Sequence, residues 1–231
     1  MDRLFNMDNK FFTFMSRVAD LIILNLLCLV CCIPIVTIGP SVSAMFYVTL
    51  KMVRNEESYI VRGFFKSFKQ NLKQGILINL IMLAAGVLLA IDISICRGTA
   101  GSLGKVLIVI FMMILVIYLM LFMYIYPVLA KFYNTIRNTF INAFLMSIRH
   151  LPYTVLMILI SAAPALVLFI PSAQVQSTVI LLLVLLGFSG IAYINSHFLV
   201  KIFDKYIPEE TSEADPDCVA DHCQDSGNSS L

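Results

Sequence analysis

The segment Gly187–Gly190 (GFSG) places a serine between two glycines inside a long apolar run, and such a serine is a candidate nucleophile for an intramembrane protease. A serine nucleophile needs a base within hydrogen-bond reach. His197 lies eight residues further along the same predicted helix, about 12 Å away along its axis. His150 lies at the opposite end of a different predicted helix. We therefore expect the small residues to allow close helix packing, and we predict no catalytic residues and no enzymatic activity.

Cysteine and histidine form two groups that could bind a metal ion. Cys28, Cys31 and Cys32 lie inside the first apolar run, where cysteine commonly serves as a small apolar side chain. The segment Cys218–Cys223 (CVADHC) offers two thiols and one imidazole, which is three of the four ligands of a structural zinc site. Because no fourth ligand is fixed for either group, we predict no metal and no cofactor.

Polar residues inside apolar runs are candidates for function by default, because they are costly in a bilayer. Asp20 and Asp92 lie near the ends of predicted helices, where water is close. Asn25, Asn79 and Asn195 lie deeper, and neutral amides often bridge helices. Nucleotide-binding loops of the Walker A or glycine-rich type do not occur in the sequence, so any coupling to ATP would have to come from a partner.

Four long stretches without Asp, Glu, Lys or Arg must position these residues. The chain is 60% hydrophobic and 13% charged, whereas soluble domains are about 25% charged. A bilayer core about 30 Å thick needs roughly 20 apolar residues per helical crossing. The sequence therefore predicts an all-α, polytopic transmembrane bundle built on the charge-free runs Leu21–Leu50, Gln74–Ile91, Val106–Ala130 and Leu151–Val200.

The first and last runs are too long for one crossing each. The segment Pro34–Pro40 (PIVTIGP) breaks the first run, since two prolines and a glycine interrupt helical hydrogen bonding. We predict helices at 18–36 and from Ser41 to about Arg54. Polar residues at Pro171–Ser177 divide the last run into 152–170 and 178–200. This gives about six membrane helices, or five if 41–54 is re-entrant, and the first is expected to be retained rather than cleaved as a signal peptide.

Basic residues predict the orientation. Six crossings with both termini in the cytoplasm place 14 basic residues inside and 2 outside. Five crossings with the N-terminus outside place 11 inside and 5 outside. We therefore expect a multi-pass protein of the cell membrane with both termini cytoplasmic.

Two predicted cytoplasmic segments, 59–74 and 131–149, are amphipathic elbows between membrane helices. In the first, aromatic residues share one helical face, and Arg62, Lys66, Lys69 and Lys73 form a row about 100° away. This pattern is typical of an interfacial helix with snorkelling lysines, and the many phenylalanines argue against nucleic acid as its ligand. In the second, Tyr133, Ile136, Phe140, Phe144 and Ser147 face one way. A loose internal repeat or the general character of cytoplasmic loops accounts for the similarity.

Two segments are the predicted functional elements. The turn offers non-helical backbone at or near the membrane, which is tolerated only where protein or a cavity satisfies it, and a plain extracellular turn is the alternative. Its candidate residues are Pro34, Thr37, Gly39 and Pro40. The first elbow is a candidate lipid- or partner-binding surface, with candidate residues Phe64, Phe65, Lys66, Phe68, Lys69, Asn71 and Lys73.

Charge separates two domains. Residues 1–206 carry all 16 basic and 7 acidic residues, a net charge of +9, and form the predicted membrane domain. Residues 207–231 carry the other 7 acidic residues and no basic one. That composition predicts a disordered, solvated cytoplasmic tail.

Residues 1–206 resemble the YesL-like family, membrane proteins of Gram-positive bacteria (mainly Firmicutes) that form a domain of unknown function. The resemblance rests on Leu4-Phe5-Asn6, on Pro34–Pro40 followed by Ala44, Phe46 and Tyr47, and on Phe64–Asn71 (FFKSFKQN). Members commonly carry a tryptophan in the first helix, which this chain lacks. The family's genes often lie beside carbohydrate-uptake transporters, so the resemblance implies an accessory role in carbohydrate uptake.

Two functions follow as hypotheses. The first is an accessory or regulatory component of a sugar ABC transporter. An ordinary permease subunit is disfavoured, because permeases carry a Glu- and Gly-containing docking loop and residues 131–149 have neither residue. The second is a non-transporting sensor or scaffold that presents its elbows and tail to a partner such as a histidine kinase. The bilayer is the expected environment in both, and the oligomeric state stays open.

Overall fold

The protein is described by a computed structural model that defines the backbone of residues 2–56, 59–98, 102–132, 134–167 and 172–206. The predicted tail at 207–231 lies outside these described residues. Within them the chain is all-helical, as predicted. The elements are α1 (Asp2–Cys31), η1 (Ile35–Thr37, a 3₁₀ turn), α2 (Ile38–Val53), α3 (Ile60–Gly98), α4 (Ser102–Lys131), α5 (Ile136–Arg149), α6 (Leu151–Val167), α7 (Ala173–Leu182), η2 (Leu183–Gly187, a π-helical turn) and α8 (Phe188–Phe203).

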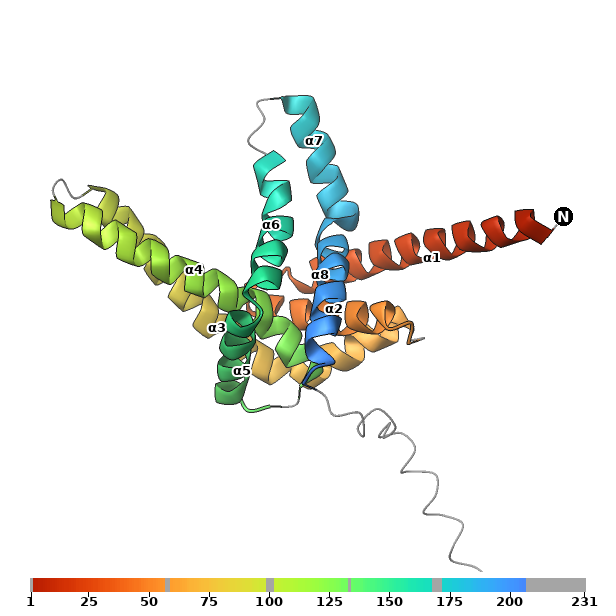
Figure 1. The fold of residues 1–231 in the computed structure, drawn as a ribbon, viewed down its shortest axis with the longest axis horizontal. Helices are drawn as coiled ribbons and strands as arrows, with labels where there is room; N and C mark the ends of the chain where they lie inside the picture. The colour runs from red at the N-terminus through yellow and green to blue at the C-terminus, as the bar shows by residue number, and fades with distance from the viewer. Residues whose placement is uncertain (1, 57–58, 99–101, 133, 168–171, 207–231) are drawn as a thin grey trace, which may run out of the picture.

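The helices form a branched arrangement around a common centre. Figure 1 shows α3 and α4 side by side as one arm, α6 and α7 as a second, and α1 pointing away from both. Five described helices are long and apolar enough to cross a membrane, and a sixth is present if the bent pair of α5 and α6 counts as one span. The chain is therefore a multi-pass membrane protein, in agreement with the five or six crossings predicted.

The segments α1, α2 and α3 form a layer with its own apolar core, which we call the α1–α3 layer. The core contains Leu24 and Cys28 of α1, Ala44 and Val48 of α2, and Phe64 of α3. The two α2 residues are four apart, so they share one helical face. The first helix ends at Cys31 rather than near residue 36 and begins far earlier than residue 18. The second begins at Ile38 rather than Ser41, so Gly39 and Pro40 belong to its first turn, where proline is tolerated.

The helix α3 corrects the prediction of a separate elbow at 59–74. It runs unbroken for 39 residues, and the amphipathic segment is its first half. No proline occurs in Ile60–Gly98, so nothing interrupts the backbone hydrogen bonding. Phe64 was expected at the acyl boundary, but it is fully buried in the core of the α1–α3 layer, whereas Phe65 and Val61 are exposed.

The second predicted elbow is shorter than expected. The helix α4 extends to Lys131, and only α5 is a separate segment, bent by 100° relative to α6. Phe144 is exposed, contrary to the predicted shared face, and Tyr133 lies outside the described residues. The face that α5 buries consists of Thr139, Ala143, Met146 and Ser147.

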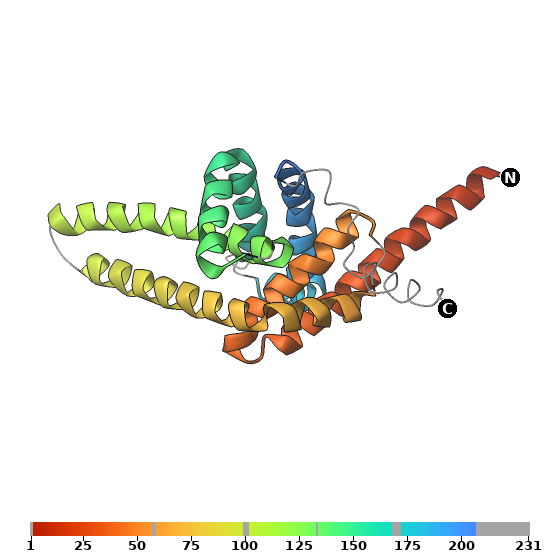
Figure 2. The same cartoon turned by 90° about the horizontal axis from the view of Figure 1, so that it is seen from below.

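A second core joins α4, α5, α6 and α8. Tyr124 and Val128 of α4 pack there with Met157 of α6 and Leu199 and Phe203 of α8. The last run folds back as predicted, but α7 already begins at Ala173 and continues through η2 into α8, so the second limb of the hairpin is longer than 178–200. Figure 2 shows the end of α8 close to the α1–α3 layer.

Candidate functional site

The turn between α1 and α2 is held by its own hydroxyl group. Thr37 Oγ1 donates to the carbonyl oxygens of Cys31 (2.7 Å) and Pro34 (2.8 Å). Ser41 Oγ donates to the Thr37 carbonyl at 2.7 Å. Non-helical carbonyls near a membrane need such partners, so Thr37 has a structural role that its place in the predicted turn only suggested.

A glycine–glycine contact joins the turn to α3. A Cβ atom on Gly39 would lie 2.7 Å from Asn79 Cβ and would also collide with the Gly75 carbonyl. A Cβ atom on Gly75 would lie 2.9 Å from Pro40 Cγ and 3.0 Å from Pro40 N. Only glycine allows this approach, so Gly39 and Pro40 are packing residues that place the start of α2 directly on α3.

Asn79 adds hydrogen bonds to the contact between the turn and α3. Its Nδ2 donates to the Ile35 carbonyl at 3.0 Å, and its Oδ1 accepts a hydrogen bond from the Tyr126 hydroxyl of α4 at 3.1 Å. One amide therefore connects the turn, α3 and α4. The predicted role of Asn79 as a bridge between helices is confirmed.

The outer face of the first half of α3 carries the predicted basic row. Arg62, Lys66, Lys69 and Lys73 are all exposed, and we call this surface the basic face. The opposite side is buried at Phe64, Ser67, Asn71 and Gly75. Asn71, predicted to belong to the lipid- or partner-binding surface, is instead buried, with its Nδ2 donating to Ser67 Oγ at 3.3 Å. Phe68 is half-buried against the layer core.

The pairing of α2 with α3 places α2 beside the basic face. Gly39 touches Gly75 at one end, and Met52 and Ile60 line one cleft at the other, so α2 runs antiparallel to residues 60–79. A charged residue at the bilayer centre costs about 2.5–3.5 kcal/mol. An α2 that crossed the bilayer would carry the adjacent row of cations into the membrane interior. This cost argues for the re-entrant alternative for 41–54, whereas by length and composition Ile35–Val53 qualifies as a span.

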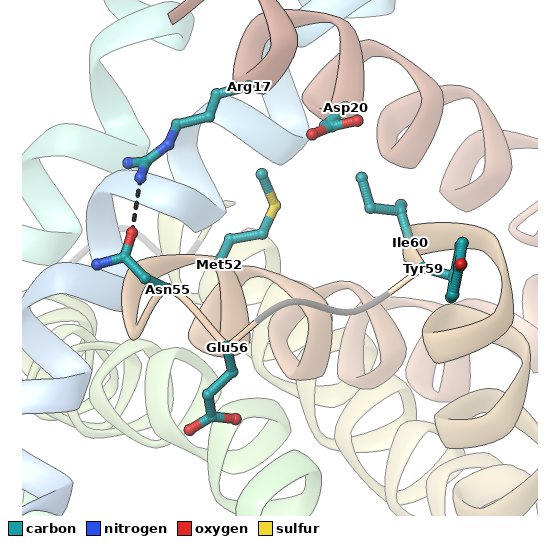
Figure 3. Close-up of a pocket in the computed structure, with 7 residues that line it drawn as sticks. All are labelled: Arg17, Asp20, Met52, Asn55, Glu56, Tyr59 and Ile60. Atoms are coloured by element: carbon teal, nitrogen blue, oxygen red, sulfur yellow. Dashed lines mark hydrogen bonds between the residues drawn. The ribbon is translucent and has the colours of Figure 1, made fainter. Parts of the chain in front are cut away.

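A cleft of about 610 Å³ opens between α1 and the connection from α2 to α3 (Figure 3). Arg17 donates from Nη2 to Asn55 Oδ1 at 2.6 Å and from Nη1 to the Tyr193 hydroxyl at 3.1 Å. Asp20 lies one turn further along α1 and also lines the cleft, while the Glu56 carboxylate points away from Arg17. The cleft thus offers separate positive and negative groups to a small polar ligand.

Asn55 shapes the cleft through its backbone. Its φ of 56° lies in the left-handed region, which asparagine tolerates better than most residues. This conformation lets the chain turn sharply after α2. Tyr59, at the far side of the cleft, is 82% exposed, and the Arg62 guanidinium lies 5.8 Å from its ring centre. The cleft and the basic face are therefore adjacent.

Polar contacts tie α8 to the α1–α3 layer. Thr49 Oγ1 and Ser196 Oγ are buried and 2.8 Å apart. Further toward the C-terminal ends of both helices, Arg54 just after α2 forms an ion pair with Asp204 just after α8. These contacts fix the end of α8 against the end of α2.

The end of α8 also contacts the start of α6. His150 Nε2 lies 3.2 Å from the Tyr206 hydroxyl. Burial, with Lys205 and Arg149 nearby, lowers the pKa of His150. The Arg149 guanidinium lies 5.6 Å from the centre of the Tyr206 ring.

Asn25 forms hydrogen bonds with backbone groups of the π-helical turn in the last hairpin. Its Nδ2 donates to the carbonyls of Leu183 (3.3 Å) and Val184 (2.6 Å), and its Oδ1 accepts from the Ser189 amide at 3.1 Å. A π turn interrupts the regular hydrogen-bond ladder, and Asn25 satisfies the groups that are released. It is a bridge between helices, as predicted.

The serine of the GFSG segment, Ser189, packs between helices and is not available as a nucleophile. Ser189 is fully buried, and its Oγ donates to the Leu21 carbonyl at 2.8 Å. His197 Nδ1 lies 3.1 Å from the carbonyl of Tyr193 in its own helix. The third amide, Asn195, donates to Ser161 Oγ of α6 at 3.1 Å, so it too joins two helices.

The remaining candidates are dispersed. Cys28 and Cys32 lie 3.9 Å apart between their sulfur atoms and are free thiols. Among the described residues, no three His, Cys, Asp or Glu side chains gather as metal ligands do. The group at Cys218–Cys223 lies outside the described residues. Asp92 is half-buried near the end of α3.

Sequence reasoning missed the residues that join the elements. Gly75 was not singled out, although a glycine within a helix is a signal for close backbone approach. The pairing of Arg17 with Tyr193 and that of Arg54 with Asp204 join residues far apart in the chain. No spacing rule could have identified these pairs.

Part of the chain matches a known family model. Residues 21–93 match the model of a family described as "Protein of unknown function, DUF624". No curated protein and no solved structure matches the chain. The matched residues extend from α1 through most of α3, so the anchored turn and the basic face both lie within them.

Proposed function

We propose that this membrane protein is an accessory or regulatory component of carbohydrate uptake that works beside the membrane subunits of a sugar ABC transporter. The observation that carries the proposal is the rigid link between the turn and the basic face. Both are built on α3, and four exposed cations lie opposite a face that is packed against α2. A docking surface for a partner needs such support.

The sequence supports the transport setting. The likeness of residues 1–206 to the YesL-like family implies a link with carbohydrate uptake, and the DUF624 match at residues 21–93 covers the last part of α1, all of α2 and most of α3. The absence of Glu and Gly from 131–149 disfavours an ordinary permease subunit. An accessory protein needs a surface for its partner rather than a nucleotide site, and the basic face provides one for an acidic partner.

We also propose that the basic face lies at the cytoplasmic surface of the membrane. In this arrangement α1 and α2 form a hairpin that enters and leaves the interface on one side. Of the five or six helices that are long and apolar enough to cross, α1 and α2 then lie at the interface. Residues 74–96 of α3, with α4, α6 and the α7–α8 limb, provide the remaining four crossings, so both termini stay cytoplasmic. The exposed Ile23, Leu26 and Val30 of α1 then meet the acyl boundary.

Uptake of a labelled sugar tests the proposal. The assay uses cells that lack the protein and express the transporter from a constant promoter. We expect the wild-type protein to restore uptake and the variant R62Q/K66Q/K69Q/K73Q to fail, because its partner surface has lost its charge. The matched control is R97Q/K105Q, which removes two exposed cations at the other end of the α3–α4 arm. Full restoration by the quadruple variant would contradict the proposal.

The cleft favours a second candidate, a sensor or scaffold for a signalling partner such as a histidine kinase. Arg17 and Asp20 line a space of about 610 Å³ directly beside the basic face, so a ligand there is well placed to alter a bound partner. In this case, loss of the protein changes the induction of transporter genes. Uptake at fixed transporter level stays the same, which separates the two functions in one assay.

A further inference from the structure

The basic face is a continuous strip of one charge. Its four cations are spaced by four, three and four residues, which places them on one side of α3 over about 16 Å. The sequence contains no acidic residue between positions 60 and 91. The first carboxylate of α3 is Asp92, 19 residues beyond Lys73 and about 28 Å further along the helix, so no acidic side chain of α3 lies beside the strip.

The C-terminal segment starts where α8 is tied to the end of α2, just before the chain enters α3. Asp204 forms an ion pair with Arg54, and α3 begins six residues after Arg54. Tyr206, the last described residue, packs against His150 and Arg149 at the same end of α8. The chain then continues with residues 207–231, which carry seven carboxylates and no cation.

We propose that the acidic segment 207–231 docks along the basic face of α3 in the same chain. An extended chain covers about 3.3 Å per residue, so the first ten residues after Tyr206 can span roughly 33 Å, about twice the length of the strip. In an extended chain Asp217 and Asp221 are four residues, or about 13 Å, apart, which fits within the 16 Å of cations, and the other carboxylates flank them. Exposed ion pairs are individually weak and are screened by salt, so the docked segment is readily displaced.

The consequence is regulation by competition. A segment that covers Arg62, Lys69 and Lys73 blocks an acidic partner or anionic lipid from the same face. Only this consequence rests on the proposed function. The docking is a property of the isolated chain and is tested without a transporter, so its failure is distinct from failure of the uptake experiment.

Zero-length carbodiimide cross-linking of the purified full-length protein tests the docking. The reagent joins a carboxylate to a lysine amine only when the two are in contact, and mass spectrometry of the band of single-chain mass locates the product. We expect tail carboxylates joined to Lys66, Lys69 and Lys73. Lys105, exposed at the far end of the α3–α4 arm, is the internal control.

A charge variant and salt make the test decisive. In R62Q/K66Q/K69Q the remaining Lys73 is the reporter, and we expect its cross-link to fall about tenfold. In the wild-type protein, raising salt from 0.1 to 1 M shortens the screening length from about 10 to 3 Å and should give a similar loss. Yields at Lys73 equal to those at Lys105, or unchanged by both treatments, would overturn the proposal. Protection of these lysines by anionic vesicles, without any tail cross-link, would also overturn it and assign the face to lipid headgroups.

Discussion

The contact between Gly75 and the first turn of α2 supports a quantitative prediction. An alanine Cβ at position 75 would lie 2.9, 3.0 and 3.1 Å from the Cγ, N and Cα atoms of Pro40. Two of these atoms belong to the backbone, so α2 itself must shift. Overpacking of this kind costs about 1–3 kcal/mol. The matched control is Gly190→Ala in α8, where the new Cβ would meet only the Leu186 side chain at 3.8 Å.

The comparison of the two variants isolates the clash. Both substitutions replace a helical glycine, so both gain about 1 kcal/mol of helix propensity. The difference between them is therefore the overpacking cost, and at about 2–4 °C per kcal/mol Gly75→Ala should unfold about 2–12 °C below Gly190→Ala. Circular dichroism of the two purified variants during heating in the same detergent measures this difference. Equal midpoints would refute the close approach of α2 and α3.

Three further predictions concern the buried polar bridges. Asn79→Leu removes the donor to the Ile35 carbonyl and should lower the free energy of unfolding by about 1–3 kcal/mol; an unchanged denaturation midpoint would contradict the anchor. Asn25→Leu leaves the carbonyls of the π turn unpaired and should cost a similar amount, with increased hydrogen exchange confined to the last hairpin; uniform exchange would argue against this role. Thr49→Val and Ser196→Ala, combined in a double-mutant cycle, should show a coupling free energy of about 0.6 kcal/mol. Strictly additive effects would show that the two hydroxyl groups do not stabilise the fold through a hydrogen bond.

The fold class could be predicted because each membrane helix requires one continuous run of about 20 apolar residues, which is visible in the sequence alone. Charge-free stretches identify membrane helices, and the prolines at 34 and 40 mark the turn. The continuity of α3 could also have been inferred, since Ile60–Gly98 contains no proline. Amphipathicity pointed instead to a separate elbow, because a cationic row predicts an interface but says nothing about where a helix ends.

The candidate site was predictable only in part. The basic face follows from spacing alone, and the structure confirms that its four residues are exposed. The burial of Phe64 could not be predicted, because an apolar side chain fits a protein core and an acyl boundary equally well. The partners of Asn25 and Asn79 lie far away in sequence, and such pairings depend on the folded arrangement of the helices.

Recovery of partners from native membranes tests the central claim, that the basic face of the α1–α3 layer binds a membrane transport system. Tagged wild-type protein and the variant R62Q/K66Q/K69Q/K73Q are purified in mild detergent from equal amounts of membrane, and co-purified proteins are quantified by mass spectrometry. The account predicts stoichiometric recovery of sugar-transporter membrane subunits with the wild-type protein and R97Q/K105Q, and their loss from the quadruple variant. Recovery of the wild-type protein alone, or of transporter subunits in equal amounts with all three, would contradict it.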